Sequence, residues 1–138
     1  MSDLSGKVFI VTGGESGIGQ AIAMRAVRDG ANIVIAGINN EGLDETVASM
    51  SNLTGNGFAI PTDVTKSDQV QAMVEGALEK FGRIDGAVAN AGAFVKQTSF
   101  AEMSLDDWNR VVAVNLTGVF LTLQATLKVL LKQGEGGS

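Results

Sequence analysis

The stretch Thr12-Gly13-Gly14-Glu15-Ser16-Gly17-Ile18-Gly19 stands where an apolar run ends, glycines gather and a helical pattern begins. Before it, residues 7–11 have the β-branched and aromatic composition of a strand buried on both faces of a parallel sheet. After it, apolar residues recur at helical spacing up to Gly30, a residue type that readily takes the left-handed conformation ending a helix. These apolar residues are Ile18, Ala21, Ile22 and Ala26. Strand, glycine turn and helix in this order predict an anion site, because the unpaired N–H groups of the helix then point above the sheet.

Three glycines of the turn have separate physical tasks. We expect Gly13 to permit the sharp exit from the strand, Gly17 to let the backbone approach a pyrophosphate, and Gly19 to bring the helix close to the sheet. The spacing Gly-x-x-x-Gly-x-Gly differs from the Gly-x-Gly-x-x-Gly of the commonest dinucleotide fingerprint. Because the chain has 18 glycines among 138 residues, an ordinary turn is the alternative on this motif alone.

Composition and charge narrow the classes of function. A chain of 138 residues with 45% hydrophobic content fits one folded domain. Its net charge of -5, without a basic cluster, argues against nucleic acid as a partner. It has no cysteine and no histidine, so we expect neither thiolate chemistry nor a metal site. The first residues form neither a basic region nor an apolar secretory core, which favours a cytoplasmic protein.

Strands and helices alternate along the chain. Further strands are predicted at 33–36, 58–60 and 84–89, and helices at 43–50 and 70–81. For the helix at 70–81, Thr65 or Ser67 can cap the start and Gly82 closes the end. The alternation predicts an α/β fold with a parallel sheet covered on both faces, whose ligands bind at the carboxyl ends of the strands. Gly37, Asp63 and Asn90 are expected at this same edge as the glycine turn.

The last long segment predicts one helix from about 105 to 132. Ser104 and Asp107 resemble a capping box at its start, and residues 111–131 are apolar nearly all round. A membrane span is disfavoured, because polar residues interrupt the segment and an α/β domain precedes it; they are Asn115, Gln124 and Lys128. One sheet cannot cover such a helix, so we expect it to meet a partner chain or more of its own chain. The expected association surface consists of Val119, Phe120, Leu123, Leu127 and Leu130.

Four motifs follow one another in the chain: Thr12-Gly13-x-x-x-Gly17-x-Gly19, Asp63-Val64, Asn90-Ala91-Gly92 and Val114-Asn115-Leu116. With these motifs the chain resembles the classical form of the short-chain dehydrogenase/reductase family over nearly all its length. The resemblance implies a Rossmann-like, doubly wound parallel sheet in three α/β/α layers, with strand order 3-2-1-4 in the part present. It implies a single dinucleotide-binding domain over 1–138 that stops before the fifth strand. It also implies an NAD(P)-dependent oxidoreductase that acts on an alcohol or carbonyl substrate and forms homo-oligomers through the helix at 105–132.

The resemblance assigns roles to individual residues. Thr12 would tie the glycine turn to the fourth strand, and Asn115 matches the asparagine of the family's catalytic proton relay. The adenosine and pyrophosphate would be held by Gly13, Ser16, Gly17, Ile18 and Gly19. The adenine would lie between Asp63 and Val64, and the nicotinamide ribose beside Asn90, Ala91 and Gly92. The structural alternatives are a helix cap for Asp63 and a polar kink in a buried helix for Asn115.

One departure from the family pattern concerns the choice between NAD and NADP. The family places an acidic residue at the end of the second strand for the ribose of NAD, and an arginine after it for the 2′-phosphate of NADP. Gly37 and Ile38 stand at these positions here. We favour NAD, because Glu15 lies in the glycine turn and no Lys or Arg lies there or directly after the second strand. Asn39 could serve either ribose.

The second departure concerns catalysis. The family's proton donor is the tyrosine of a Tyr-x-x-x-Lys motif, and this sequence contains no tyrosine. We therefore expect the 138 residues to represent the cofactor-binding part of an enzyme and to be inactive alone. The alternative is a non-catalytic dinucleotide-binding or assembly module that uses its long apolar helix to meet a partner.

Overall fold

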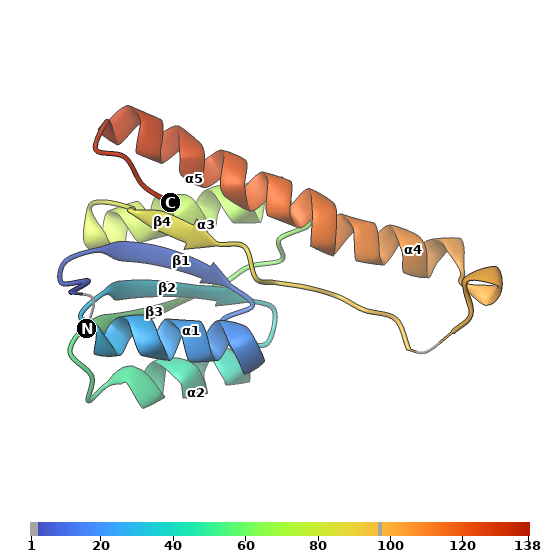
Figure 1. Cartoon of the computed structure of the whole chain (residues 1–138), viewed down its shortest axis with the longest axis horizontal. Coiled ribbons are helices and arrows are strands. Elements are labelled where there is room, and N and C mark those ends of the chain that lie inside the picture. The colour runs from blue at the N-terminus through green and yellow to red at the C-terminus, as the bar shows by residue number, and fades with distance from the viewer. Residues whose placement is uncertain (1–2, 97) are drawn as a thin grey trace.

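The computed structural model describes residues 3–96 and 98–138 and forms three layers, with a parallel sheet between two layers of helices (Figure 1). The elements, in chain order, are β1 (Val8–Thr12), α1 (Gly17–Arg28), β2 (Asn32–Gly37), α2 (Asn40–Met50), β3 (Asn56–Pro61), α3 (Ser67–Phe81), β4 (Gly86–Val88), the 3₁₀ turn η1 (Phe100–Glu102), α4 (Leu105–Val112), the π-helical segment η2 (Ala113–Gly118) and α5 (Val119–Gln133). The strand order is β3-β2-β1-β4, with every pairing parallel. The predicted fold class and strand order are confirmed.

Alternating side chains of the strands build two apolar cores. Ile10 of β1 and Val34 of β2 pack with residues of α3 and α5, whereas Val11 and Ile35 pack with residues of α1 and α2. All four side chains have at most 1% of their surface exposed. A strand buried on both faces needs a continuous apolar run, and this explains the composition of residues 7–11.

The buried face of α1 differs from the predicted one. The helix packs on the sheet through Gly19, Ala23 and Val27, which recur every four residues. Ile18 is 75% exposed and Ala21 is exposed, while Ile22 and Ala26 lie at the margin of the core. Apolar residues extend round most of this helix, so their spacing did not identify the face that meets the sheet. The predicted helix end is confirmed, because Gly30 directly follows the C-cap and has φ +95°.

Helix α3 shows the predicted apolar face and the predicted end, but not the predicted cap. Its buried residues are Val70, Met73, Val74 and Ala77. Gly82 takes a left-handed conformation with φ +76°, and its N–H donates to the carbonyl of Leu78 at 2.7 Å. The N-cap position is Lys66, which makes no side-chain cap hydrogen bond. The hydroxyl of Thr65 donates instead to Oδ1 of Asp63, at 2.7 Å.

The predicted single helix at 105–132 consists of three parts. Its start is confirmed, because Ser104 Oγ accepts the N–H of Asp107 at 3.0 Å and donates to the Asp107 carboxylate at 2.9 Å. The π-helical segment η2 then separates α4 from α5, a change of winding that the apolar pattern does not reveal. By length and composition, Leu105–Gln133 is apolar enough to cross a membrane, a test that the core helix of a soluble protein also passes. Here α5 lies over α3 and β4, while α4 extends beyond the sheet (Figure 1).

The apolar surface of this helix is confirmed in kind but corrected in its members. Val119 and Leu130 are partly buried within the chain and do not belong to the exposed surface. In α4, Leu105 and Trp108 are exposed, and the large apolar side chains that remain exposed further along are Leu116 of η2 and Phe120, Leu123, Leu127 and Leu131 of α5. We call the five residues from Leu116 to Leu131 in this list the α5 apolar face, although the first of them lies in η2. Between 47% and 74% of the surface of each of these side chains is exposed, so the described elements do not provide the predicted cover on more than one side of the helix.

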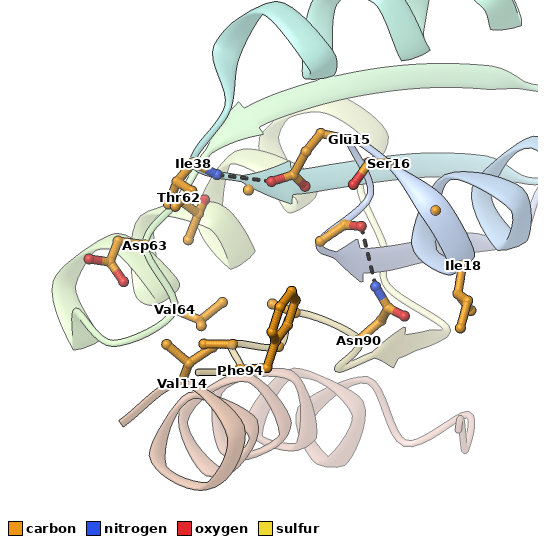
Figure 2. Close-up of a pocket in the computed structure, with 16 residues that line it drawn as sticks. Glu15, Ser16, Ile18, Ile38, Thr62, Asp63, Val64, Asn90, Phe94 and Val114 are labelled. Atoms are coloured by element: carbon orange, nitrogen blue, oxygen red, sulfur yellow. Dashed lines mark hydrogen bonds between the residues drawn. The ribbon is translucent and has the colours of Figure 1, made fainter. Parts of the chain in front are cut away.

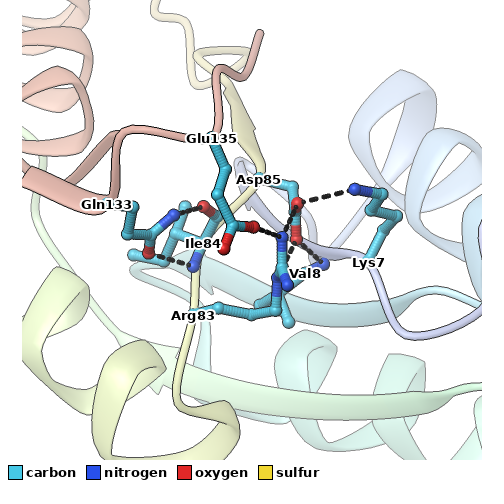
Figure 3. A network of polar contacts seen from close by, with 7 residues as sticks. All are labelled: Lys7, Val8, Arg83, Ile84, Asp85, Gln133 and Glu135. Carbon is cyan, nitrogen blue, oxygen red and sulfur yellow. Dashed lines mark hydrogen bonds and ion pairs between the residues drawn. The ribbon is translucent and has the colours of Figure 1, made fainter. Parts of the chain in front are cut away.

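Polar contacts fix the amino end of β4 to its neighbours (Figure 3). The Asp85 carboxylate accepts the backbone N–H of Val8 at 2.9 Å and the Nζ of Lys7 at 3.1 Å. Arg83 donates to Asp85 at 2.7 and 2.9 Å and to Glu135 at 2.9 Å. The segment after α5 thus lies beside β4, where Ser138 donates to the carbonyl of Asp85 and accepts the N–H of Ala87.

Candidate functional site

A cleft of about 590 Å³ opens at the carboxyl ends of the strands (Figure 2). Its lining residues are Gly13, Glu15, Ser16, Gly17, Ile18, Gly37, Ile38, Thr62, Asp63, Val64, Asn90, Ala91, Gly92, Ala93, Phe94 and Val114. Every residue predicted to bind the cofactor lines this cleft except Gly19. The volume lies within the range of about 300 to 1,000 Å³ that is usual for small-molecule sites. Residues from segments far apart in the sequence therefore converge on one cavity of suitable size.

The glycine turn presents the start of α1 to the cleft. Ser16 is the N-cap residue, and the first turn of the helix contains no acidic side chain. Gly17 has φ +54°, and a Cβ at this position would meet nothing within 4 Å, so its side is open. The N–H groups of the first helical turn have no partner within the helix, and the helix dipole favours an anion beside them. This geometry suits a phosphate group.

Gly19 has a packing task and not a lining one. A Cβ at Gly19 would overlap with the carbonyl oxygen of Gly13. The residue is buried, and its lack of a side chain brings α1 against the turn. The predicted close approach is confirmed, whereas the structure gives Gly19 no surface in the cleft.

Thr12 and Asn90 join the glycine turn to the segment after β4. The buried hydroxyl of Thr12 accepts the N–H groups of Asn90 at 3.0 Å and Ala91 at 3.1 Å. The Asn90 side chain donates to the carbonyls of Thr12 at 3.0 Å and Gly13 at 3.2 Å. These contacts hold the two loops side by side, as predicted for Thr12 and Asn90. They fix the shape of the cleft floor.

Asp63 and Val64 form another part of the wall. The N–H and hydroxyl of Thr65 both donate to Oδ1 of Asp63, at 2.9 and 2.7 Å. These bonds lower the pKa of Asp63, so the group is ionised at neutral pH. Lys66 holds the N-cap position of α3, but Asp63 accepts the N–H groups of Thr65 and Lys66 and so orders the entry of this helix, in line with the structural alternative. Val64 is buried against Gly118, where a Cβ would lie 2.6 Å from Val64 Cγ2.

Asn115 lies in the π-helical segment and holds Ala93, one of the residues that line the cleft. Its Oδ1 accepts the N–H of Ala93 at 2.7 Å, and its Nδ2 donates to the carbonyl of Ala93 at 2.8 Å. Asn115 itself does not line the cleft, and its side chain is exposed, so the alternative of a polar kink inside a buried helix is wrong. π-helical turns are frequent at functional sites. The proton-relay role of Asn115 stays a prediction.

The position of Glu15 was not predicted from the sequence. Its side chain extends from the glycine turn to the end of β2, where Oε1 accepts the N–H of Ile38 at 3.3 Å (Figure 2). Oε2 is buried and has no hydrogen-bond partner within the described part of the chain. Asn39, the alternative ribose ligand, lies outside the cleft, and its Oδ1 accepts the N–H of Gly42 at the start of α2. The one sequence signal for the contact between Glu15 and the end of β2 was that Glu15 lies in the glycine turn while a glycine, Gly37, ends the second strand.

The cleft differs from a metal centre. Among residues 3–96 and 98–138, no group of three or more His, Cys, Asp or Glu side chains is placed to hold a metal ion. The part of the lining that can attract an anion consists of backbone N–H groups, and the charged side chains in it are Glu15 and Asp63. The lining therefore combines the backbone N–H groups at the start of α1 with two acidic side chains.

Residues 7–138 match the sequence profile of a family described as short chain dehydrogenase. A short chain dehydrogenase/reductase, astE, from Aspergillus oryzae is 45% identical over 136 residues, which cover 98% of this chain and 52% of the relative. Glucose 1-dehydrogenase 2 from Bacillus subtilis is 39% identical over 137 residues, or 99% of this chain and 53% of the relative. The chain thus spans about half the length of the curated relatives it matches.

Solved structures give the same result. A short-chain type dehydrogenase/reductase from Mycobacterium marinum superposes with a TM-score of 0.93 at 36% identity, over 98% of this chain and 53% of the other. Levodione reductase superposes with a TM-score of 0.90 at 36% identity, over 96% of this chain and 52% of the other.

Proposed function

The chain belongs to the short chain dehydrogenase family, and on that premise we propose that it forms the cofactor-binding part of an NAD(P)-dependent oxidoreductase for the alcohol or carbonyl group of a small molecule. The observation that carries the proposal is the cleft, in which a glycine turn and the start of α1 meet the loops after β3 and β4. Ligands of open α/β sheets bind at such a position.

Each part of the cleft suits one part of a dinucleotide. The backbone around Ser16, Gly17 and Ile18 would hold the pyrophosphate, since it offers the open N–H groups of α1. Asp63 and Val64 would border the adenine, and the segment 90–92 would border the nicotinamide ribose. When bound, the nicotinamide supplies or accepts the hydride of the reaction. The residues of this chain bind and orient it, and Asn115 holds the loop at Ala93 beside it.

We favour NAD over NADP as the cofactor. The cleft has no Lys or Arg among its described lining residues, so nothing with a positive side chain is available to pair with a 2′-phosphate. Glu15 and Asp63 both contribute negative charge to the lining. Both features disfavour an additional phosphate on the ribose.

The proposal extends to partners and location. The α5 apolar face supports homo-oligomers, because it leaves large side chains in water that a second copy could cover. The family supports a small-molecule substrate, and the net charge of -5 without a basic cluster disfavours nucleic acid as a partner. Asn115, Gln124 and Lys128 interrupt the apolar helix, which argues for the cytoplasm and against a membrane.

A binding and turnover assay on the purified chain tests this function. We expect NADH or NADPH to bind, measured by calorimetry, without steady oxidation in the presence of ketones, aldehydes or quinones. Proton transfer to the substrate oxygen supplies about 10²- to 10⁴-fold in such reactions. The sequence has no tyrosine, histidine or cysteine to supply it. Steady turnover that co-purifies with the chain and vanishes in Asn115→Ala would contradict the expected inactivity.

The reading frame of the natural protein separates an enzyme from the alternative, a non-catalytic module. A continuation that contains a serine and then Tyr-x-x-x-Lys supports the oxidoreductase. A natural protein whose intact mass equals that of these 138 residues, and which binds a dinucleotide without turnover, supports the module.

A further inference from the structure

We propose that Glu15, reaching across from the glycine turn, binds the hydroxyl groups of the adenosine ribose and excludes a 2′-phosphate. This inference rests on the proposed function and names the residue that selects the cofactor. The usual acid for this task belongs to the end of the second strand. In this chain that position is Gly37, and the carboxylate comes from a different loop.

The first observation is the place of the carboxylate. Glu15 Oε1 accepts the N–H of Ile38 at 3.3 Å, directly after β2 (Figure 2). Glu15, Gly37 and Ile38 all line the cleft. A negative group therefore stands at the end of the second strand although no acidic residue occupies that position in the sequence.

The second observation is that Gly37 and Glu15 depend on each other. A Cβ at Gly37 would overlap with the carboxylate carbon and both carboxylate oxygens of Glu15. Any side chain at position 37 would therefore displace the Glu15 carboxylate. Because the displaced atoms are the end of a flexible side chain, the strand itself need not move. A glycine at position 37 and an acid at position 15 thus form one arrangement.

The third observation is an unused acceptor. Glu15 Oε2 is buried and lacks a hydrogen-bond donor within residues 3–96 and 98–138. Buried carboxylate oxygens without a donor are costly, so a rotation of the flexible Glu15 side chain that carries this oxygen into the cleft, to a donor on a ligand, is favoured. Ribose hydroxyls are such donors. A 2′-phosphate carries negative charge and mainly acceptor oxygens at neutral pH, so it would be repelled by the same carboxylate.

Calorimetry with two ligands tests the inference: ADP-ribose and its 2′-phosphorylated form. Neither ligand contains nicotinamide, so the measurement concerns the adenosine half of the cleft alone. For Glu15→Gln, we expect the preference for ADP-ribose to fall at least about tenfold, because the amide keeps the shape and loses the charge. Glu41→Gln is the matched control. It removes the same charge from an exposed residue in the first turn of α2, outside the lining, and should change the preference by less than about twofold.

Two further variants test the dependence between positions 15 and 37. Gly37→Ala should lower the preference in the same direction as Glu15→Gln, because the added methyl group displaces the carboxylate. The double variant Glu15→Ser, Gly37→Asp should regain most of the preference, since the acid then stands on β2 itself. Circular dichroism confirms that each variant is folded.

The outcomes separate the two proposals. A wild-type chain that binds ADP-ribose, with a preference unchanged within about twofold in both Glu15→Gln and Gly37→Ala, overturns the role of Glu15 and leaves the proposed function intact. A folded wild-type chain that binds neither ligand overturns the proposed function, and this inference with it.

Discussion

Two carboxylates lie at opposite ends of the sheet and differ in the number of hydrogen bonds that they accept. At the amino ends of the strands, Asp85 receives hydrogen bonds from the backbone of Val8 and from the side chains of Lys7 and Arg83. At the carboxyl ends, Glu15 has one long hydrogen bond and a buried oxygen for which the described residues provide no donor. At the amino ends, the carboxylate finds its hydrogen-bond partners within the chain. At the carboxyl ends, the carboxylate can still bind a ligand. The difference separates residues that stabilise the fold from residues that bind.

The amino end shows what a completed polar network does to an acid. Burial opposes ionisation of Asp85, but the hydrogen bonds from Arg83, Val8 and Lys7 outweigh it and lower the pKa of Asp85 to about 2. The same contacts raise the pKa of Arg83. Gln133 adds two hydrogen bonds to the backbone of Ile84, at 3.0 and 2.7 Å. This end therefore joins β1, β4 and the segment after α5.

The largest expected effect is on the open end. Gly17→Val should weaken dinucleotide binding by at least about a hundredfold, because the new side chain enters the space beside the first N–H groups of α1. Calorimetry of the folded variant measures this. Gly82→Val is the matched control, since Gly82 also has a positive φ and open space around its Cβ, but lies at the end of α3. Both variants should lose similar stability. Unchanged affinity in folded Gly17→Val would refute the proposed phosphate site.

The next largest effect is expected at Asp85, at the amino ends of the strands. Asp85→Asn should lower the free energy of unfolding at pH 7 by about 2 kcal/mol, the value of a pKa lowered by nearly two units. Because the pKa is lowered in the folded state, this stability is present above about pH 4 and is lost as the pH falls toward 2. Urea unfolding of both proteins at pH 7 and pH 2.5 checks it. Cofactor affinity should stay unchanged. A difference between the two proteins that is equally large at both pH values would contradict the assignment to this carboxylate.

The sequence predicted the repeating parts of this structure and the tie between Thr12 and Asn90, but it missed the contact of Glu15 with the end of β2. The β-branched runs and the apolar face at Val70, Met73 and Val74 were sufficient for the strands and α3, because burial imposes a period on them. The nine predicted residues that line the cleft follow from motifs at the ends of strands. The placement of Glu15 beside Gly37 depends on two loops distant in sequence, which no period records. The π-helical segment was missed because it leaves the apolar pattern unchanged.

The exposed apolar side chains of the long helix should make it associate with a second copy of the chain. Replacing both Phe120 and Leu127 of the α5 apolar face by Glu should weaken self-association at least about tenfold, because two large apolar contacts become charged. Light scattering at micromolar concentration measures the mass. Lys128→Glu is the control, as it changes charge at an exposed position of the same helix. A wild-type mass equal to one chain, without binding of a hydrophobic dye, would show that this face has no partner of its own kind.

The smallest effect is expected where the long helix contacts the loop that lines the cleft. Gln133 fixes one end of the helix to the backbone of Ile84 with two hydrogen bonds, and Asn115 makes an analogous pair with the backbone of Ala93. The two hydrogen bonds of Asn115 are exposed, so water can take their place on the Ala93 backbone in Asn115→Ala. We therefore expect the free energy of unfolding to fall by at most about 1 kcal/mol. The local effect should be clearer. Exchange of the Ala93 amide hydrogen should become faster, and affinity for the dinucleotide should fall by about threefold or less, because the loop that lines the cleft is no longer held. Gln133→Ala is the matched comparison: it should accelerate exchange at Ile84 and leave affinity unchanged. If Asn115→Ala left the exchange of the Ala93 amide unaltered, the loop at Ala93 would be held by its own backbone. The Asn115 pair would then have no part in shaping the cleft.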